Sequence, residues 1–215
     1  MFFKKIDMET WSRKDCFNHF STVAQSTYSI TVDVDITKLM EHVNDKKLRL
    51  FPTFTWIVAS AINNHEEFRM GYDENGNLGI FNEVYPYYSV MDEDTKVMDT
   101  LCTPFKREFK EFYKNMIEDT ESYGREKKKT KWYPNYFIAS CIPWMSYSSF
   151  TASNESGNAF FFPMVTWGKF HEVNGNIVMP LTLQIHHAVA DGYHCSLFYS
   201  DVEKMLEYPE KYLKL

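Results

Sequence analysis

Alternating apolar and polar residues mark the first candidate strands of this chain. Residues 30–36 read Ile-Thr-Val-Asp-Val-Asp-Ile, the two-residue period of a half-buried strand. Two further strand-like runs, 160–171 and 177–185, flank an Asn-Gly pair at 174–175. A second Asn-Gly lies within the Asp-Glu-Asn-Gly-Asn segment 73–77, which predicts a turn with a hairpin around it.

Helical periodicity appears in other segments. Asp35 is placed to cap a helix, and Pro52 stands where the first turn of a helix tolerates proline. Helices are predicted over residues 37–42, 54–62, 106–119 and 196–208. Helices and strands are mixed without strict alternation. We therefore expect an α+β fold with a large mixed β-sheet flanked by helices. No repeat, low-complexity tract or linker is present, so residues 1–215 should form one domain.

Composition narrows the function classes. The net charge of −6 argues against general binding of nucleic acid, and the 17% aromatic content suits a sheet-rich core or an apolar pocket. Residues 1–25 show no secretory h-region, and no run approaches the roughly 20 apolar residues of a membrane helix. The four cysteines form no CxxC pair, which favours reduced thiols in a cytoplasmic protein.

Candidate chemistry concentrates in Gln-Ile-His-His-Ala-Val-Ala-Asp-Gly-Tyr-His, residues 184–194, which holds three of the seven histidines. Three interpretations compete: a metal site, a catalytic base, or a polar turn rich in imidazole. Adjacent side chains on a strand point to opposite faces, so His186 and His187 cannot easily share one metal ion. No metal site is therefore expected. An imidazole with a pKa of about 6.5 can act as a general base near neutral pH, but this leaves the substrate open.

The segment 186–192 matches the HHxxxDG motif. It resembles the chloramphenicol acetyltransferases and the acyltransferase cores of 2-oxo acid dehydrogenase complexes. Further segments resemble the chloramphenicol acetyltransferases in particular and occur in the same order: 11–14, 23–28, 32–37, 51–52, 67–70, 140–144 and 163–169. The resemblance covers nearly the whole chain and implies that family's fold.

The resemblance assigns roles to individual residues. It makes His187 the general base that deprotonates a hydroxyl attacking the thioester of acetyl-CoA. Ser140 would donate to the oxyanion, assisted by Thr166. Asp191 would form an ion pair with Arg13 that holds the turn in shape, rather than orient His187 as in a catalytic triad. His186 and His194 are left with supporting roles.

Binding residues follow from the same resemblance. Lys169 and Arg49 would contact CoA, together with Ser140 and Thr166. The family is a homotrimer with active sites between subunits, so the acceptor pocket would draw on the N-terminal third of a neighbouring chain. The positions assigned to it are Phe20, Ala24, Ser26, Tyr28, Ser89 and Met98. The implied acceptor is the primary hydroxyl of chloramphenicol, which would confer antibiotic resistance.

Three departures from the family pattern concern the acceptor more than the chemistry. Ala190 replaces a cysteine, residues 151–156 bring smaller and more polar side chains, and a lysine-rich stretch occupies 125–131. That stretch is interpreted as a solvated loop, with anion binding as the lesser alternative. The altered segments suggest another hydroxyl acceptor as an alternative. A dihydrolipoamide acyltransferase core, which shares the motif, and a non-enzymatic scaffold are the alternatives from other functional classes.

Overall fold

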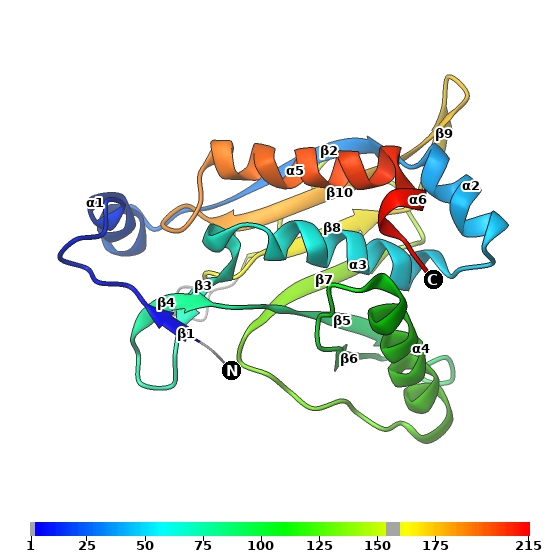
Figure 1. Ribbon diagram of the computed structural model, residues 1–215, viewed down its shortest axis with the longest axis horizontal. Coiled ribbons are helices and arrows are strands. Elements are labelled where there is room, and N and C mark those ends of the chain that lie inside the picture. Colours follow the sequence, from blue (N-terminus) through cyan, green and yellow to red (C-terminus); the bar gives the residue numbers. More distant parts are fainter. Residues whose placement is uncertain (1–2, 154–159) are drawn as a thin grey trace.

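A computed structural model describes residues 3–153 and 160–215. Its main feature is a seven-stranded mixed sheet with the order β2-β10-β8-β7-β5-β6, to which β9 is added through β10 (Figure 1). The β7 strand pairs in parallel with both β5 and β8, and the other pairs are antiparallel. The mixed sheet predicted from the sequence is confirmed. Its strands are β2 (Thr27–Asp35), β5 (Tyr85–Met91), β6 (Met98–Cys102), β7 (Tyr136–Ile142), β8 (Met164–Gly168), β9 (His171–Val173) and β10 (Asn176–His186).

A smaller sheet of order β1-β4-β3 lies beside the main one, built from β1 (Phe3–Lys5), β3 (Met70–Tyr72) and β4 (Leu78–Phe81). The turn between β3 and β4 is the predicted one. The Asp73 carboxylate accepts hydrogen bonds from the backbone N–H groups of Asn75 (2.9 Å) and Asn77 (2.8 Å). Gly76 adopts a φ of 75°, which a residue without Cβ reaches without strain. Local turn chemistry therefore sets this hairpin.

The longer helices cover one face of the main sheet (Figure 1). All four predicted helices are present, although their ends differ from those predicted: the second and the fourth begin four residues earlier, and the third begins and ends later. The Asp35 carboxylate accepts a hydrogen bond from the Thr37 backbone N–H at 2.9 Å, as expected of a residue at a helix start. The helical segments are α1 (Lys14–Asn18), the π-helical turn His19–Val23, α2 (Thr37–Asp45), α3 (Leu50–Asn63), the 3₁₀ turn Glu66–Arg69, α4 (Phe109–Glu126), α5 (Gly192–Glu207) and α6 (Pro209–Tyr212).

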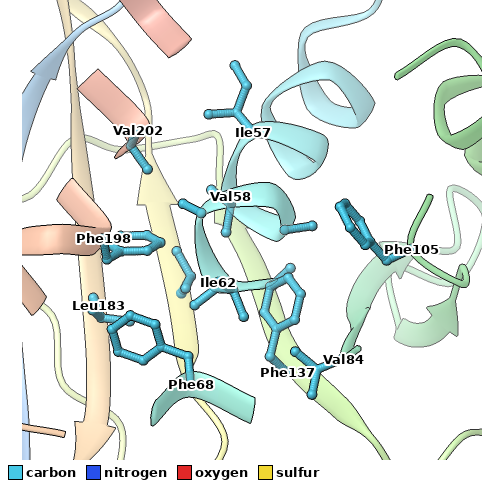
Figure 2. Close-up of a cluster of buried hydrophobic side chains, with 14 of the residues drawn as sticks. Ile57, Val58, Ile62, Phe68, Val84, Phe105, Phe137, Leu183, Phe198 and Val202 are labelled. Atoms are coloured by element: carbon cyan, nitrogen blue, oxygen red, sulfur yellow. The ribbon is translucent and has the colours of Figure 1, made fainter. Parts of the chain in front are cut away.

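The core lies between the sheet and α3, which is buried along nearly its whole length. Ile57 and Ile62 of α3 are fully buried in one hydrophobic cluster with Phe137 of β7, Leu183 of β10 and Phe198 of α5 (Figure 2). Because side chains alternate along β10, its apolar residues face this core and its polar residues face the other way. The sheet therefore presents polar groups on the face away from the helices.

The lysine-rich stretch differs from the expected solvated loop. Its first residues finish α4, and Lys127 ends the helix in the left-handed conformation, with a φ of 54°. The Lys127 ammonium lies 2.7 Å from the Asp92 carboxylate, and Lys129 lies 2.9 Å from Asp99. These two lysines therefore tie the end of α4 to the β5–β6 hairpin, a contact between distant segments that no local pattern indicates.

Within the residues that the structure describes, no helix is long and apolar enough to cross a membrane.

Candidate active site

The turn after β10 separates the two adjacent histidines. His186 ends the strand and is buried, with its ring edge-on to Phe161 at 5.0 Å between centroids. Its Nδ1 accepts the backbone N–H of Ala188 at 3.2 Å. Burial, followed by the neighbouring His187, lowers the pKa of His186. His186 is thus a neutral residue that shapes the turn.

His187 has different neighbours. Its ring stacks on Phe20 with centroids 3.9 Å apart, and its edge meets Tyr28 at 5.1 Å. Its backbone N–H donates to the carbonyl of Ser26 at 2.8 Å. The Nδ1 atom is buried and has no hydrogen-bond partner among the described residues. A substrate can therefore reach this imidazole only through Nε2.

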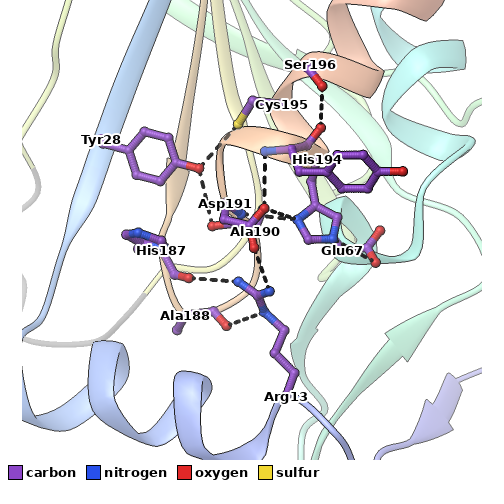
Figure 3. A network of polar contacts seen from close by, with 11 residues as sticks. Arg13, Tyr28, Glu67, His187, Ala188, Ala190, Asp191, His194, Cys195 and Ser196 are labelled. Atoms are coloured by element: carbon purple, nitrogen blue, oxygen red, sulfur yellow. Dashed lines mark hydrogen bonds and ion pairs between the residues drawn. The ribbon is translucent and has the colours of Figure 1, made fainter.

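Arg13, which belongs to the N-terminal segment of the chain, contacts the turn after β10 (Figure 3). Its Nη1 donates to the Asp191 carboxylate at 2.9 Å, and its Nε and Nη2 donate to the carbonyls of Ala188 and His187, both at 3.3 Å. Partial burial raises the pKa of Asp191, but the Arg13 hydrogen bond and the nearby His194 outweigh it, so the pKa lies below its ordinary value. The Arg13–Asp191 contact predicted from the resemblance is confirmed, whereas its catalytic role stays a prediction.

Tyr28 connects the same turn to α5. Its hydroxyl donates to the carbonyl of Ala190 at 3.3 Å and lies 3.4 Å from Sγ of Cys195 (Figure 3). Burial raises the pKa of Tyr28, so the phenol stays protonated and keeps its donor. The sequence comparison assigned Tyr28 to the acceptor pocket alone. Its hydroxyl is in fact engaged within its own chain, which only a contact across the fold could reveal.

Ser140 and Thr166 are brought together by strand pairing. They are direct register partners on the parallel strands β7 and β8, so their side chains share a face. Thr166 pairs in turn with Thr182 of β10. The hydroxyl of Tyr147 donates to the backbone carbonyl of Thr166 at 2.7 Å, while the Thr166 side-chain oxygen is buried without a partner among the described residues. A hydroxyl without a partner at this depth is available to a bound water or ligand.

Within one chain, His187 and Ser140 are not in contact. His187 follows Thr182 by five residues, which corresponds to about 16 Å along an extended chain. Ser140 lies level with Thr182 in the register, two strands away. The imidazole of His187 therefore cannot reach the Ser140 hydroxyl of its own chain.

The residues assigned to the acceptor pocket lie in two places, some beside His187 and others toward the strands that carry Ser140. Phe20, Ser26 and Tyr28 contact the His187 of their own chain, whereas the resemblance implied a neighbouring chain's N-terminal third. The Ala24 carbonyl accepts the Ser26 hydroxyl at 2.7 Å. The remaining two lie toward the other edge of the sheet.

Ser89 follows Tyr88, the register partner of Ala139 on β7, and this places Ser89 beside Ser140. Met98 begins β6 opposite Met91 and is 48% exposed. The six assigned positions therefore do not form one pocket in a single chain. The strand order, which the sequence pattern did not give, is the reason.

The two basic residues assigned to CoA lie on different elements. Lys169 directly follows β8 and is exposed, and its backbone N–H donates to Met145 at 2.9 Å. Arg49 precedes α3, and its guanidinium lies 2.9 Å from the Glu121 carboxylate with 60% of the side chain exposed. A phosphate at Arg49 would compete with this carboxylate, whereas no ion pair engages Lys169 within residues 3–153 and 160–215.

Gln184 fixes the start of the segment 151–156, the altered acceptor wall, which departs from the family pattern. The side-chain amide of Gln184 accepts the Ala152 N–H at 2.9 Å and donates to the Ala152 carbonyl at 2.6 Å. The Ser29 hydroxyl also donates to this amide, at 3.1 Å. Positions 154–156 of the wall lie outside the described residues. Among those that are described, no cluster of three His, Cys, Asp or Glu side chains could hold a metal ion.

Known proteins resemble this chain over nearly its whole length. The family model "Chloramphenicol acetyltransferase" matches residues 1–203. A chloramphenicol acetyltransferase of Staphylococcus aureus is 36% identical over 99% of this chain and 100% of its own length, and one of Campylobacter coli is 38% identical over 96% and 99%. A solved chloramphenicol acetyltransferase aligns with a TM-score of 0.85 at 24% identity, covering 95% of this chain and 100% of its own.

A dihydrolipoamide acetyltransferase of Azotobacter vinelandii aligns with a TM-score of 0.67 at 16% identity, covering 88% of this chain and 84% of its own. At that identity the likeness shows the fold alone. The family model and the full-length relatives establish more than the fold: the chain belongs to the chloramphenicol acetyltransferase family.

Proposed function

We propose that this protein transfers an acetyl group from acetyl-CoA to the primary hydroxyl of chloramphenicol. The observation that carries the proposal is the turn of His187, in a chain whose family match covers residues 1–203. That turn buries Nδ1 and leaves Nε2 for a substrate, while Arg13 holds the carbonyls of His187 and Ala188. An imidazole held in this way has the geometry of a general base.

The reaction needs a base, an oxyanion donor and a second proton transfer. His187 Nε2 would take the hydroxyl proton while the hydroxyl oxygen forms a bond to the thioester carbonyl carbon. The Ser140 hydroxyl would donate to the resulting oxyanion, and Thr166 would assist through a bound water. The tetrahedral intermediate then breaks its carbon–sulfur bond, and the imidazolium returns the proton to the departing thiolate. No covalent enzyme intermediate is needed.

The cysteines take no part in this scheme. Cys141 and Cys195 are next to the proposed groups, but burial raises the pKa of both thiols, that of Cys141 to about 12. Neither would form a thiolate at neutral pH.

Two chains are needed to complete the site. Because His187 lies about 16 Å along the strand from the row that holds Ser140, the oxyanion donor opposite His187 must come from another copy. We infer a homotrimer in which Phe20, Ser26 and Tyr28 accompany His187, and the next subunit supplies Ser140, Thr166 and Ser89. A cyclic assembly of this kind gives every chain the same pair of half-sites.

CoA would bind along the end of β8. Lys169 is exposed and lies three residues beyond Thr166, directly after the end of β8, so its ammonium would contact a phosphate of CoA at this end of the strand. Arg49 is the second candidate, although its partner Glu121 weakens its attraction for a phosphate. Acetyl-CoA acts here as a co-substrate.

Release of CoA thiol from acetyl-CoA tests the proposal. Purified protein with acetyl-CoA and chloramphenicol should release thiol, detected with a thiol reagent, and the acetylated product should appear by mass spectrometry. Hydrolysis without chloramphenicol is the control. A wild-type chain that releases no thiol above this control would contradict the proposed reaction.

A second acceptor is worth testing because Gln184 fixes Ala152 at the start of the altered wall. A panel of other hydroxylated compounds and dihydrolipoamide, compared by kcat/KM and by product mass, would rank chloramphenicol against them. A compound with a higher kcat/KM than chloramphenicol would identify the better acceptor.

A further inference from the structure

Asp191 is held by a second contact, opposite to the one from Arg13. Nδ1 of His194 lies 2.8 Å from Oδ1 of Asp191, while Arg13 pairs with Oδ2 at 2.9 Å. Each carboxylate oxygen therefore has its own side-chain partner. Oδ1 also accepts the backbone N–H of Tyr193 at 3.2 Å, so Asp191 caps the first turn of α5 as well.

The His194 ring is itself fixed from the other side. Its Nε2 lies 3.5 Å from the Glu67 carboxylate, and the His194 side chain is only 16% exposed (Figure 3). Nδ1 also lies 3.2 Å from the backbone N–H of Asp191, but it cannot accept this hydrogen and donate to Oδ1 together. The shorter contact is with Oδ1, which can only accept, and this favours a donor at Nδ1.

We infer that His194 is a positioning residue for the active-site turn and that Glu67 supports it, in addition to Arg13. The contacts run from the 3₁₀ turn Glu66–Arg69 through His194 to Asp191, and from Asp191 through Arg13 to the carbonyl of His187. His194 touches none of the proposed reacting groups. It sets the orientation of the Asp191 carboxylate, and this orientation decides whether Arg13 can reach the turn.

This inference rests on the proposed function, because it concerns the rate of the same reaction. Replacing His194 with alanine should lower kcat about ten-fold, the effect of losing one charge-assisted hydrogen bond. The KM values for acetyl-CoA and chloramphenicol should stay close to wild type. His194→Asn should recover most of kcat, because its amide nitrogen can take the place of Nδ1, and Glu67→Gln should have a smaller effect than His194→Ala.

Ser196→Ala provides the matched control. Its hydroxyl donates to the Tyr193 carbonyl at 2.6 Å in the same helical turn, and within the described part of the chain no hydrogen bond joins its side chain to Asp191. This variant should keep the wild-type kcat. If His194→Ala keeps the wild-type kcat, or if Ser196→Ala loses as much as His194→Ala, the inference is wrong.

A double-mutant cycle in urea tests the network without an activity assay. The free energies of unfolding of Asp191→Asn, His194→Ala and the double variant should be non-additive, because the two residues share one contact. If the wild-type chain proves inactive, the proposed function fails, and this cycle alone then tests the inference about His194. Coupling between the two positions then supports the role of His194 in holding Asp191, and strict additivity overturns it.

Discussion

The turn that carries His187 and the strands that carry Ser140 and Thr166 are held by different kinds of contact. The turn depends on side chains from distant segments: Arg13 from the N-terminal region and Tyr28 from β2. Ser140 and Thr166 depend on backbone pairing between β7 and β8. A single substitution can therefore displace the base, whereas the oxyanion group should tolerate the loss of any one neighbouring side chain.

The largest effect is expected at His187 itself. His187→Ala should lower kcat by a factor of about 10²–10⁴, because a positioned general base contributes that much. Thiol release from acetyl-CoA measures it, and thermal unfolding checks that the variant folds. His42→Ala, which removes an imidazole from α2, is the control and should keep the wild-type rate. A His187→Ala chain that keeps a tenth of that rate would contradict the assignment.

Mixing two inactive chains tests whether the two regions meet across a subunit interface. Ser140→Ala alone should lose a factor of about 10²–10³ in rate, as expected for an oxyanion donor. Random trimers of His187→Ala and Ser140→Ala chains should recover about a quarter of the wild-type rate, because a site works only when each partner supplies its intact residue.

The control for this mixing experiment pairs His187→Ala with the His187→Ala, Ser140→Ala double variant. This mixture contains no intact base and should recover nothing. If the first mixture also recovers nothing, His187 and Ser140 do not come from different chains.

The Arg13–Asp191 ion pair should make the stability contributed by the turn depend on pH, which distinguishes the turn from the strands that carry Ser140. Asp191→Asn should lower stability at pH 7 by about 1–2 kcal/mol, between the values for exposed and for buried ion pairs, because 37% of the Asp191 side chain is exposed. Because folding lowers the pKa of Asp191, the stabilisation is present above the unfolded value of about 3.9. It is lost as the pH falls through the lower pKa of the folded state.

Urea unfolding of wild type and Asp191→Asn at several pH values measures this effect. The difference between them should narrow below about pH 4, and Asp191→Asn should also turn over more slowly at pH 7. Ser140→Ala, which carries no such charge, should show the same difference from wild type at every pH. A constant difference for Asp191→Asn would contradict the role of the ion pair.

The smallest effects are expected at the basic residues assigned to CoA. Lys169→Ala should raise the KM for acetyl-CoA about three-fold, the modest loss expected at an exposed charge. Arg49→Ala should raise it less, because Glu121 already engages the guanidinium. Added salt should shrink both effects. An equal or larger rise for Arg49→Ala would reverse the assignment.

Several elements follow from local sequence alone. The apolar periods predicted the helices that became α2, α3, α4 and α5, and the Asn-Gly pair within 73–77 predicted the hairpin β3–β4. The second Asn-Gly pair joins β9 to β10, but the strand-like run 160–171 before it is divided between β8 and β9. These predictions hold because side-chain period and turn geometry are decided within a few residues. Helix ends were less certain: α4 begins at Phe109 and runs to Glu126, where Lys127 adopts a positive φ.

The sequence by itself also identified the family, and with it the contact between Arg13 and Asp191. Only the tertiary structure decided which candidate residues are neighbours. The strand order places Ser140 beside Thr166 and away from His187, and Phe20 and Tyr28 against the His187 of their own chain. The approach of Glu67 to His194 was equally invisible, because a contact between residues more than a hundred positions apart depends on how the chain packs.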